Sequence, residues 1–249
     1  MYFDLSHPLE DSPLDSITHK QREAMALSLG YARMAVVSRT LSSGQVSASD
    51  RCSDASDKHM MRLNLVMTET IQPGPALVSM LQTYDLVAAI PRSERAMQQA
   101  CTSLDCDIIS LDLNQRLPFK LKPALLSAAV KRGIHFEILY SGLLRDPTSR
   151  RHLINNSQAL TRLLRGRNVI LSSGARNAFE LRGPADVMAL ATELLGFASK
   201  EKAKMAMTQG PKDAIDKGLV RKEGRSGSNI RIEVQMEGET TTVSKRKRA

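Results

Sequence analysis

The chain has 249 residues, of which 42% are hydrophobic, and its formal net charge is +9 at neutral pH. This length and apolar content are sufficient for one α/β barrel or for two small domains, and they exclude a chain that is disordered throughout. No run of apolar residues approaches the ~18 that a membrane span needs, so we expect no contact with a membrane.

Short apolar runs alternate with longer segments of helical periodicity along most of the chain, which is the pattern of a βα repeat. Glycines at 30, 133, 166 and 196 follow amphipathic segments and predict helix ends, while Ser93, Asp146 and Pro184 predict helix starts. About seven βα units without a GxGxxG or GxxxxGK loop favour a small TIM-like barrel over a doubly wound sheet. The predicted strands span residues 2–5, 34–38, 63–69, 86–90, 107–112, 135–140 and 168–172.

Two segments interrupt this pattern. Residues 40–59 are rich in Ser and Asp and predict a long mobile loop. Residues 200–249 carry 13 Lys and Arg against 7 Asp and Glu, a net charge of +6, and the other residues carry 22 against 19, a net charge of +3. Because the stretch after Ser199 shows no apolar periodicity, we predict a barrel over residues 1–199 and a flexible, disordered basic tail over residues 200–249.

Basic side chains follow the carboxyl ends of several predicted strands, within residues 84–95, 107–122, 133–151 and 169–184. The carboxyl ends of parallel strands meet at one end of a barrel, so one rim of the barrel should be cationic. Guanidinium and ammonium groups there either pair with phosphates of RNA or are ordinary solvated charges. The candidate RNA-binding residues are Arg92, Arg95, Arg116, Lys120, Lys122, Arg176 and Arg182.

Two further segments are weaker candidates. Ser172, Ser173 and Gly174 follow the last predicted strand, where backbone amides form either a phosphate nest or a tight turn. The run Lys245, Arg246, Lys247 and Arg248 is typical of a nuclear import signal or of a nonspecific nucleic-acid tail. With nine Phe and Tyr residues and no Trp, we expect recognition of RNA by its backbone and shape more than by base stacking.

The strings around Asp107–Lys122, Gly133–Tyr140 and Ser172–Pro184, in this order, resemble the thirty-kilodalton-class protein subunit family of ribonuclease P and ribonuclease MRP. The resemblance runs from Tyr2 to about Gly196. It implies a TIM-like barrel related to the polymerase-and-histidinol-phosphatase superfamily.

The resemblance also implies a function and partners. A member of this family is a non-catalytic subunit that supports 5′-end cleavage of precursor tRNA and, in ribonuclease MRP, ribosomal RNA processing, in the nucleus and nucleolus. The catalytic RNA performs the hydrolysis with Mg²⁺, and the chain itself binds no cofactor. The expected partners are that RNA, precursor tRNA, other protein subunits of the particle and, as an open alternative, a second copy of the chain.

The main alternative is a metal-dependent phosphoesterase on the same barrel, which needs clustered histidines and carboxylates at the strand ends. Asp4 and His7 are three residues apart, a spacing that places them on opposite faces of a regular strand. The other histidines are predicted in helices (His19 and His152), in the Ser-rich loop (His59) and at the entering end of a strand (His135).

The carboxylates of the predicted strands and the cysteines also give no clear metal site. Asp107, Asp112 and Glu137 provide oxygen ligands for one Mg²⁺, but acidic residues of barrel strands more often pair with an internal Arg or Lys. The three cysteines, Cys52, Cys101 and Cys106, fit neither a disulfide framework nor a four-ligand zinc site, and they indicate a reducing compartment. We therefore expect no metal site and no catalytic residues in this chain. A third alternative, an enzyme that acts on a small molecule at the barrel rim, is disfavoured because the sequence shows no recognisable pair of nucleophile and base.

Overall fold

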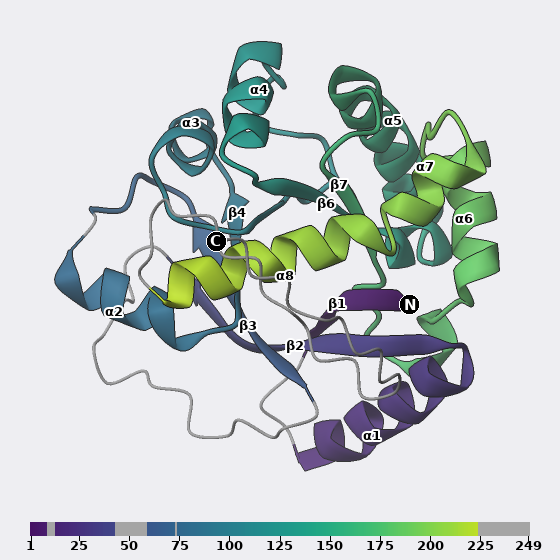
Figure 1. Cartoon of the computed structure of the whole chain (residues 1–249). Helices are drawn as coiled ribbons and strands as arrows, with labels where there is room; N and C mark the ends of the chain where they lie inside the picture. Colours follow the sequence, from purple (N-terminus) through teal and green to yellow (C-terminus); the bar gives the residue numbers. More distant parts are fainter. Residues whose placement is uncertain (9–12, 43–58, 73, 224–249) are drawn as a thin grey trace, which may run out of the picture.

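The fold is a nearly closed parallel barrel, as predicted, and its strands adjoin one another in chain order from β1 to β7. The computed structural model describes residues 1–8, 13–42, 59–72 and 74–223, with helices ringing the strands on the outside (Figure 1). The strands are β1 (Tyr2–Pro8), β2 (Tyr31–Ser42), β3 (Met60–Met67), β4 (Leu86–Pro91), β5 (Ile108–Ser110), β6 (His135–Leu139) and β7 (Val169–Ser172). The helices are α1 (Pro13–Ser28), α2 (Pro75–Thr83), α3 (Glu94–Thr102), α4 (Pro123–Lys131), η1 (Tyr140–Leu144), α5 (Pro147–Leu164), η2 (Ala178–Glu180), α6 (Pro184–Glu193), α7 (Lys200–Met205) and α8 (Gln209–Lys222).

Alternate residues of the strands build two separate apolar layers. Leu86 and Ala88 of β4 belong to the cluster inside the barrel, which also contains Leu5 and Ile108. Their neighbour Val87 packs instead in the larger cluster between the strands and the surrounding helices. This period of two follows from the pleat of a strand, and it explains why the strands read as nearly continuous apolar runs: both of their faces are buried.

The predicted helix boundaries are confirmed by local geometry. The side chain of Ser93 caps α3 by accepting from the Ala96 amide, and the side chain of Asp146 caps α5 by accepting from the amides of Thr148 and Ser149. Pro184 begins α6. The glycines at 30, 133, 166 and 196 all have positive φ, as a residue that closes the last turn of a helix commonly does.

β1 and β7 meet at a seam that other segments bridge. At the carboxyl end of the seam, the Gly174 amide donates to the Ser6 carbonyl oxygen at 3.1 Å. At the opposite end, the link between α7 and α8 enters the seam: the Phe3 amide donates to the Met207 oxygen, and the Leu171 amide donates to the Ala206 oxygen. Residues after Ser199 thus help to close the barrel.

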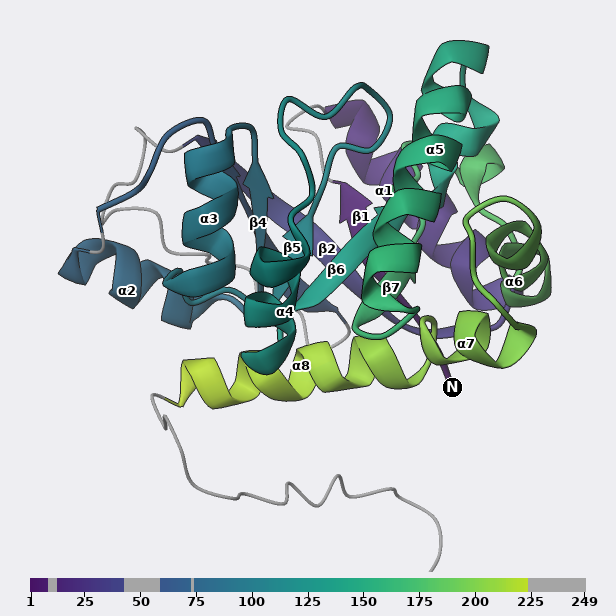
Figure 2. The same cartoon turned by 90° about the horizontal axis from the view of Figure 1, so that it is seen from above.

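The predicted boundary between barrel and tail at residue 199 is wrong, because α7 and α8 are part of the fold. α8 lies across the end of the barrel where the strands begin, which we call the basal end (Figure 2). Three small residues spaced four apart face the barrel: Gly210 approaches Ile170, Ala214 enters the interior cluster, and a Cβ on Gly218 would lie 2.2 Å from the Asp85 oxygen. A stripe of Gly and Ala gives a close helix contact without an apolar signal in the sequence.

Some predictions fall outside the described residues. These are most of the Ser-rich loop, the tail beyond residue 223, Cys52 and the basic run Lys245–Arg248. Residues 40–42, predicted as part of the loop, continue strand β2. Among the described helices, none is long and apolar enough to cross a membrane.

Candidate nucleic-acid interface

The seven predicted RNA-binding residues lie at one end of the barrel, beyond the carboxyl ends of β4, β5 and β7. Arg92 directly follows β4, and Arg95 lies in the first turn of α3. The loop between β5 and α4, which projects from the end opposite α8 in Figure 2, carries three of the others. We call this set the cationic rim: Arg92, Arg95, Arg116, Lys120, Lys122, Arg176 and Arg182.

Three members of the cationic rim have partners within the chain. Arg92 Nη1 lies 2.7 Å from Asp112 Oδ2, and Lys122 Nζ lies 2.5 Å from Glu94 Oε1. The lysine holds the pKa of Glu94 below its usual range, through a hydrogen bond and its charge. The Arg182 guanidinium donates to the Phe179 and Leu181 oxygens at 2.7 Å. Surface pairs of this kind are weak, so the two ion pairs reduce the positive charge of the rim without removing its cations.

The other four rim residues are exposed, and within the described part of the chain their side chains contact no acidic group: Arg95, Arg116, Lys120 and Arg176. Sequence reasoning missed two neighbours. Arg145 donates to the Gly174 oxygen and lies 3.4 Å from Glu180 Oε2, and Phe179 is 86% exposed. The sequence signal that could have identified Phe179 is an apolar side chain in a polar loop, without other apolar residues at helix or strand spacing.

The predicted phosphate nest at Ser172–Gly174 is not supported, because the chain itself uses these amides. The Ser173 amide donates to Asp4 Oδ1 at 2.9 Å, and the Gly174 amide donates to the Ser6 oxygen. The next amide, that of Ala175, donates to the Ser173 hydroxyl oxygen at 3.2 Å. These amides are therefore not free to bind a phosphate, which disfavours the nest of the two alternatives that the sequence left open.

The prediction that Asp4 and His7 point to opposite faces of β1 is wrong. A register shift in β1 lies between them, and it brings His7 Nε2 to 3.0 Å from Asp4 Oδ2, with both side chains 1% exposed. An irregularity of this kind turns a spacing of three into a shared face. Burial by itself raises the pKa of Asp4, but His7 and the hydrogen bonds from Ser173 outweigh it and hold that pKa below its usual range.

The carboxylates weighed as Mg²⁺ ligands pair instead with arginines. Inside the barrel, Glu137 makes a bidentate pair with Arg62, at 2.7 Å from Nη1 and 2.6 Å from Nη2. At the basal end, Asp107 accepts from Nε and Nη2 of Arg221. Asp112 pairs with Arg92 on the rim, so the three carboxylates lie apart from one another. Glu137 and Asp107 are counter-ions of buried arginines, as expected of acidic residues in barrel strands, whereas the Asp112 pair is partly exposed.

One group with metal-ligand spacing occurs among the described residues, at a place the sequence did not indicate. Ligand atoms of His19, Glu23 and His59 all lie within 4.8 Å of one another. His59 Nε2 is 3.1 Å from Glu23 Oε1, an ion pair that accounts for the contact. His19 and Glu23 are residues of α1, and His59 directly precedes β3, so none of the three belongs to a loop that directly follows a strand, where barrel chemistry takes place.

Cys101 and Cys106 are free and buried, in agreement with the prediction that they form no disulfide. Burial raises the pKa of Cys101 to about 11 and that of Cys106 to about 12. Thiols with such pKa values are poor nucleophiles at neutral pH.

The chain has relatives of known name over part of its length. It is 39% identical over 163 residues to the protein GAMETOPHYTE DEFECTIVE 1 of Arabidopsis thaliana, covering 66% of this chain and 28% of that protein. It is 35% identical over 167 residues to the ribonuclease P protein subunit p30 of Mus musculus, covering 66% of this chain and 62% of that one. A probable ribonuclease P protein subunit 3 of Schizosaccharomyces pombe is 42% identical over 124 residues, half of this chain and 53% of the relative. The chain thus spans less than two thirds of the length of these relatives.

A chain in the cryo-EM structure of archaeal ribonuclease P with mature tRNA superposes with a TM-score of 0.58 at 13% identity, covering 96% of this chain and all of that chain. This likeness shows a shared fold. The sequence pattern of the family described as RNase P subunit p30 matches residues 1–223, which include both helices that close the basal end. The chain therefore belongs to the RNase P subunit p30 family.

Proposed function

We propose that the chain is a non-catalytic protein subunit of the ribonuclease P ribonucleoprotein, which supports 5′-end cleavage of precursor tRNA. In this proposal it also serves ribonuclease MRP in ribosomal RNA processing, and it works in the nucleus and nucleolus. Its partners are the catalytic RNA, precursor tRNA and other protein subunits of the particle. The hydrolysis takes place at Mg²⁺ ions held by the RNA.

The observation that carries the proposal is the contrast between the two kinds of charge in a barrel of this family. The three carboxylates considered for catalysis, Asp107, Asp112 and Glu137, are each paired with an arginine of the same chain. The cationic rim, in contrast, keeps exposed guanidinium and ammonium groups that are not neutralised by described carboxylates. Exposed cations that are not neutralised suit the binding of phosphates. Carboxylates that are already paired with arginines suit a scaffold better than a catalytic site.

The rim assignment is tested by the salt dependence of RNA binding. Replacing Arg95, Arg116 or Arg176 singly with Ala should weaken binding of a precursor tRNA transcript without unfolding the barrel, because these side chains have no structural partner among the described residues. Each lost phosphate contact should lower the slope of log affinity against log salt by roughly 0.7 to 0.9. Fluorescence anisotropy over a series of salt concentrations measures this slope.

Lys131→Ala is the matched control, because Lys131 lies in the last turn of α4, where the helix dipole favours a cation without any ligand. The control should keep the parent slope. Equal slopes for the parent, the control and all three rim variants would show that these charges are ordinary solvated groups.

A further inference from the structure

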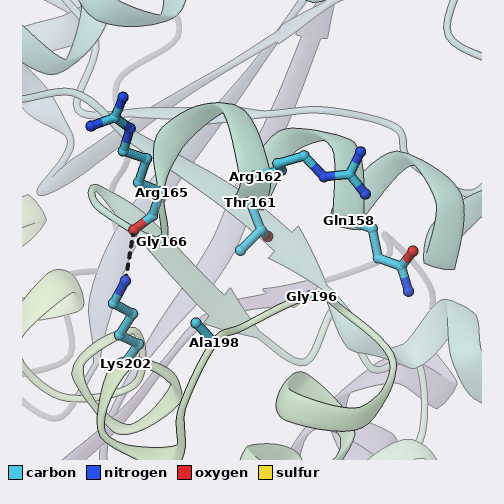
Figure 3. Close-up of a pocket in the computed structure, with 8 residues that line it drawn as sticks. All are labelled: Gln158, Thr161, Arg162, Arg165, Gly166, Gly196, Ala198 and Lys202. Atoms are coloured by element: carbon cyan, nitrogen blue, oxygen red, sulfur yellow. Dashed lines mark hydrogen bonds between the residues drawn. The ribbon is translucent and has the colours of Figure 1, made fainter.

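A second basic surface lies at the basal end of the barrel, where α5 ends beside α7. A cavity of about 290 Å³ there is lined by Arg162, Arg165 and Lys202, together with Gln158 and Thr161 (Figure 3). Thr161 points from α5 towards the segment that carries Ala198. Its side chain is buried, and its hydroxyl has no hydrogen-bond partner among the described residues.

A larger cavity of about 640 Å³ lies next to the first one, since Gly166 and Lys202 line both. His135 and Val169, the first residues of β6 and β7, line it too, which places it at the end opposite the cationic rim. We call the two cavities together the basal groove. One carboxylate, that of Asp213, lines it, against six basic residues: Arg132, Arg162, Arg165, Arg167, Lys202 and Lys217.

Some of these cations have structural roles and others do not. Arg132 donates to the Ala100 and Leu104 oxygens, and Lys202 donates to the Arg165 oxygen at 3.1 Å, the dashed line in Figure 3. In contrast, Arg162, Arg165 and Arg167 are exposed, and no carboxylate of the described residues lies within ion-pair distance of them. The groove therefore has three guanidinium groups available to an external anion.

Arg165 and Arg167 lie in the turn between α5 and β7, and Arg162 lies in the last turn of α5. Arg165 has φ 54° and Gly166 has φ 69°. A side chain other than Gly is uncommon in this left-handed region, so the chain places an arginine where glycine or asparagine fits more easily. At Gly166, a Cβ would lie 3.2 Å from Lys202 Cδ, so the glycine also lets Lys202 approach the turn.

We propose that the basal groove binds the sugar–phosphate backbone of an RNA strand, so that the chain contacts RNA at both ends of its barrel. The inference rests on the proposed function, because it takes RNA to be the polyanion that the chain meets. Guanidinium groups match phosphate oxygens in geometry, and basic residues spread over two adjacent cavities suit a polymer with repeated phosphates better than a single small anion. The subunit then bridges two RNA segments.

The test uses a triple variant of the full chain, Arg162→Ala, Arg165→Gly and Arg167→Ala. Glycine at 165 removes the side chain and tolerates the positive φ, and alanine at 162 favours the helix, so the variant should keep the parent melting temperature. Binding of a precursor tRNA transcript is measured by anisotropy over a salt series. The slope of log affinity against log salt should fall by roughly 2 to 3 for three lost contacts.

A matched rim variant, Arg95→Ala, Arg116→Ala and Lys120→Ala, separates this inference from the proposed function. If the basal groove binds RNA, the two triple variants each lower the slope, and their combination lowers it by the sum. A lower slope for the rim variant with a parent slope for the groove variant overturns the groove and leaves the function intact. Failure of the parent chain to bind the transcript removes the function itself. A folded groove variant that keeps its RNA affinity but no longer co-purifies with a protein subunit assigns the groove to an acidic protein segment, against the inference.

Discussion

Replacing Arg221 with Ala is expected to lower the free energy of unfolding by about 3 to 5 kcal/mol, the usual cost of removing one partner of a buried ion pair. Arg221 is 6% exposed, and its guanidinium donates to Asp107, to the Tyr84 oxygen at 3.0 Å and to the Leu81 oxygen. These contacts join α8 to the ends of α2, β4 and β5. The substitution leaves Asp107 buried without its counter-ion, and chemical denaturation measures the loss.

Lys222→Ala is the control for this prediction. Lys222 Nζ lies 2.7 Å from Asp85 Oδ1 in a pair whose side chains are about one third exposed. Exposed pairs contribute roughly 0 to 1 kcal/mol, so this variant should unfold nearly as the parent does. If the two variants are equally stable, then α8 is not an integral part of the domain.

The second large effect is expected inside the barrel, at Arg62 and Glu137. Arg62→Met leaves the fully buried Glu137 carboxylate without its bidentate partner, and the free energy of unfolding should fall by about 3 to 5 kcal/mol. The variant also loses hydrogen bonds to the Leu5 oxygen and to Asn64 Oδ1. The expected result is a marginally stable chain in a thermal or urea titration.

The double variant Arg62→Met with Glu137→Leu distinguishes charge from packing. Replacing both members of a buried pair by apolar side chains is often neutral or stabilising, so the double variant should recover most of the stability lost by Arg62→Met alone. A double variant less stable than Arg62→Met would contradict this account. It would show that the loss of stability does not come from leaving the Glu137 charge unpaired.

The strands and the cationic rim were predictable because their signals are local. Each strand is a short apolar run, and the order of βα units alone places the residues after β4, β5 and β7 at one end of a barrel. The same order predicts that Arg92 and Arg182, which are far apart in sequence, lie at that end. What the sequence pattern could not predict is which of these cations have partners, since Arg92 with Asp112 is a contact between two loops.

The predictions that were wrong depend on contacts and irregularities that apolar periodicity does not reveal. α8 packs through Gly210, Ala214 and Gly218, whose small side chains add almost nothing to an apolar pattern, and its buried cation pairs with Asp107, 114 residues earlier. Asp4 and His7 share a face because of an irregularity in β1 that alternation alone does not reveal. The nest weighed at Ser173 is disfavoured by the same irregularity, since the Ser173 amide donates to Asp4 Oδ1 and is not free to bind an external anion.

The most direct test of whether the subunit is non-catalytic is to measure cleavage of precursor tRNA with and without the RNA that co-purifies with the chain. The full-length chain, purified by an affinity tag from cells that express it, should bring down 5′-end cleavage activity together with a structured RNA. Nuclease digestion of that RNA should abolish the activity, and the isolated recombinant chain with Mg²⁺ should cleave nothing. Cleavage that persists in the isolated chain and disappears in an Asp4→Asn or His7→Gln variant would contradict the account, because the barrel would then be an enzyme.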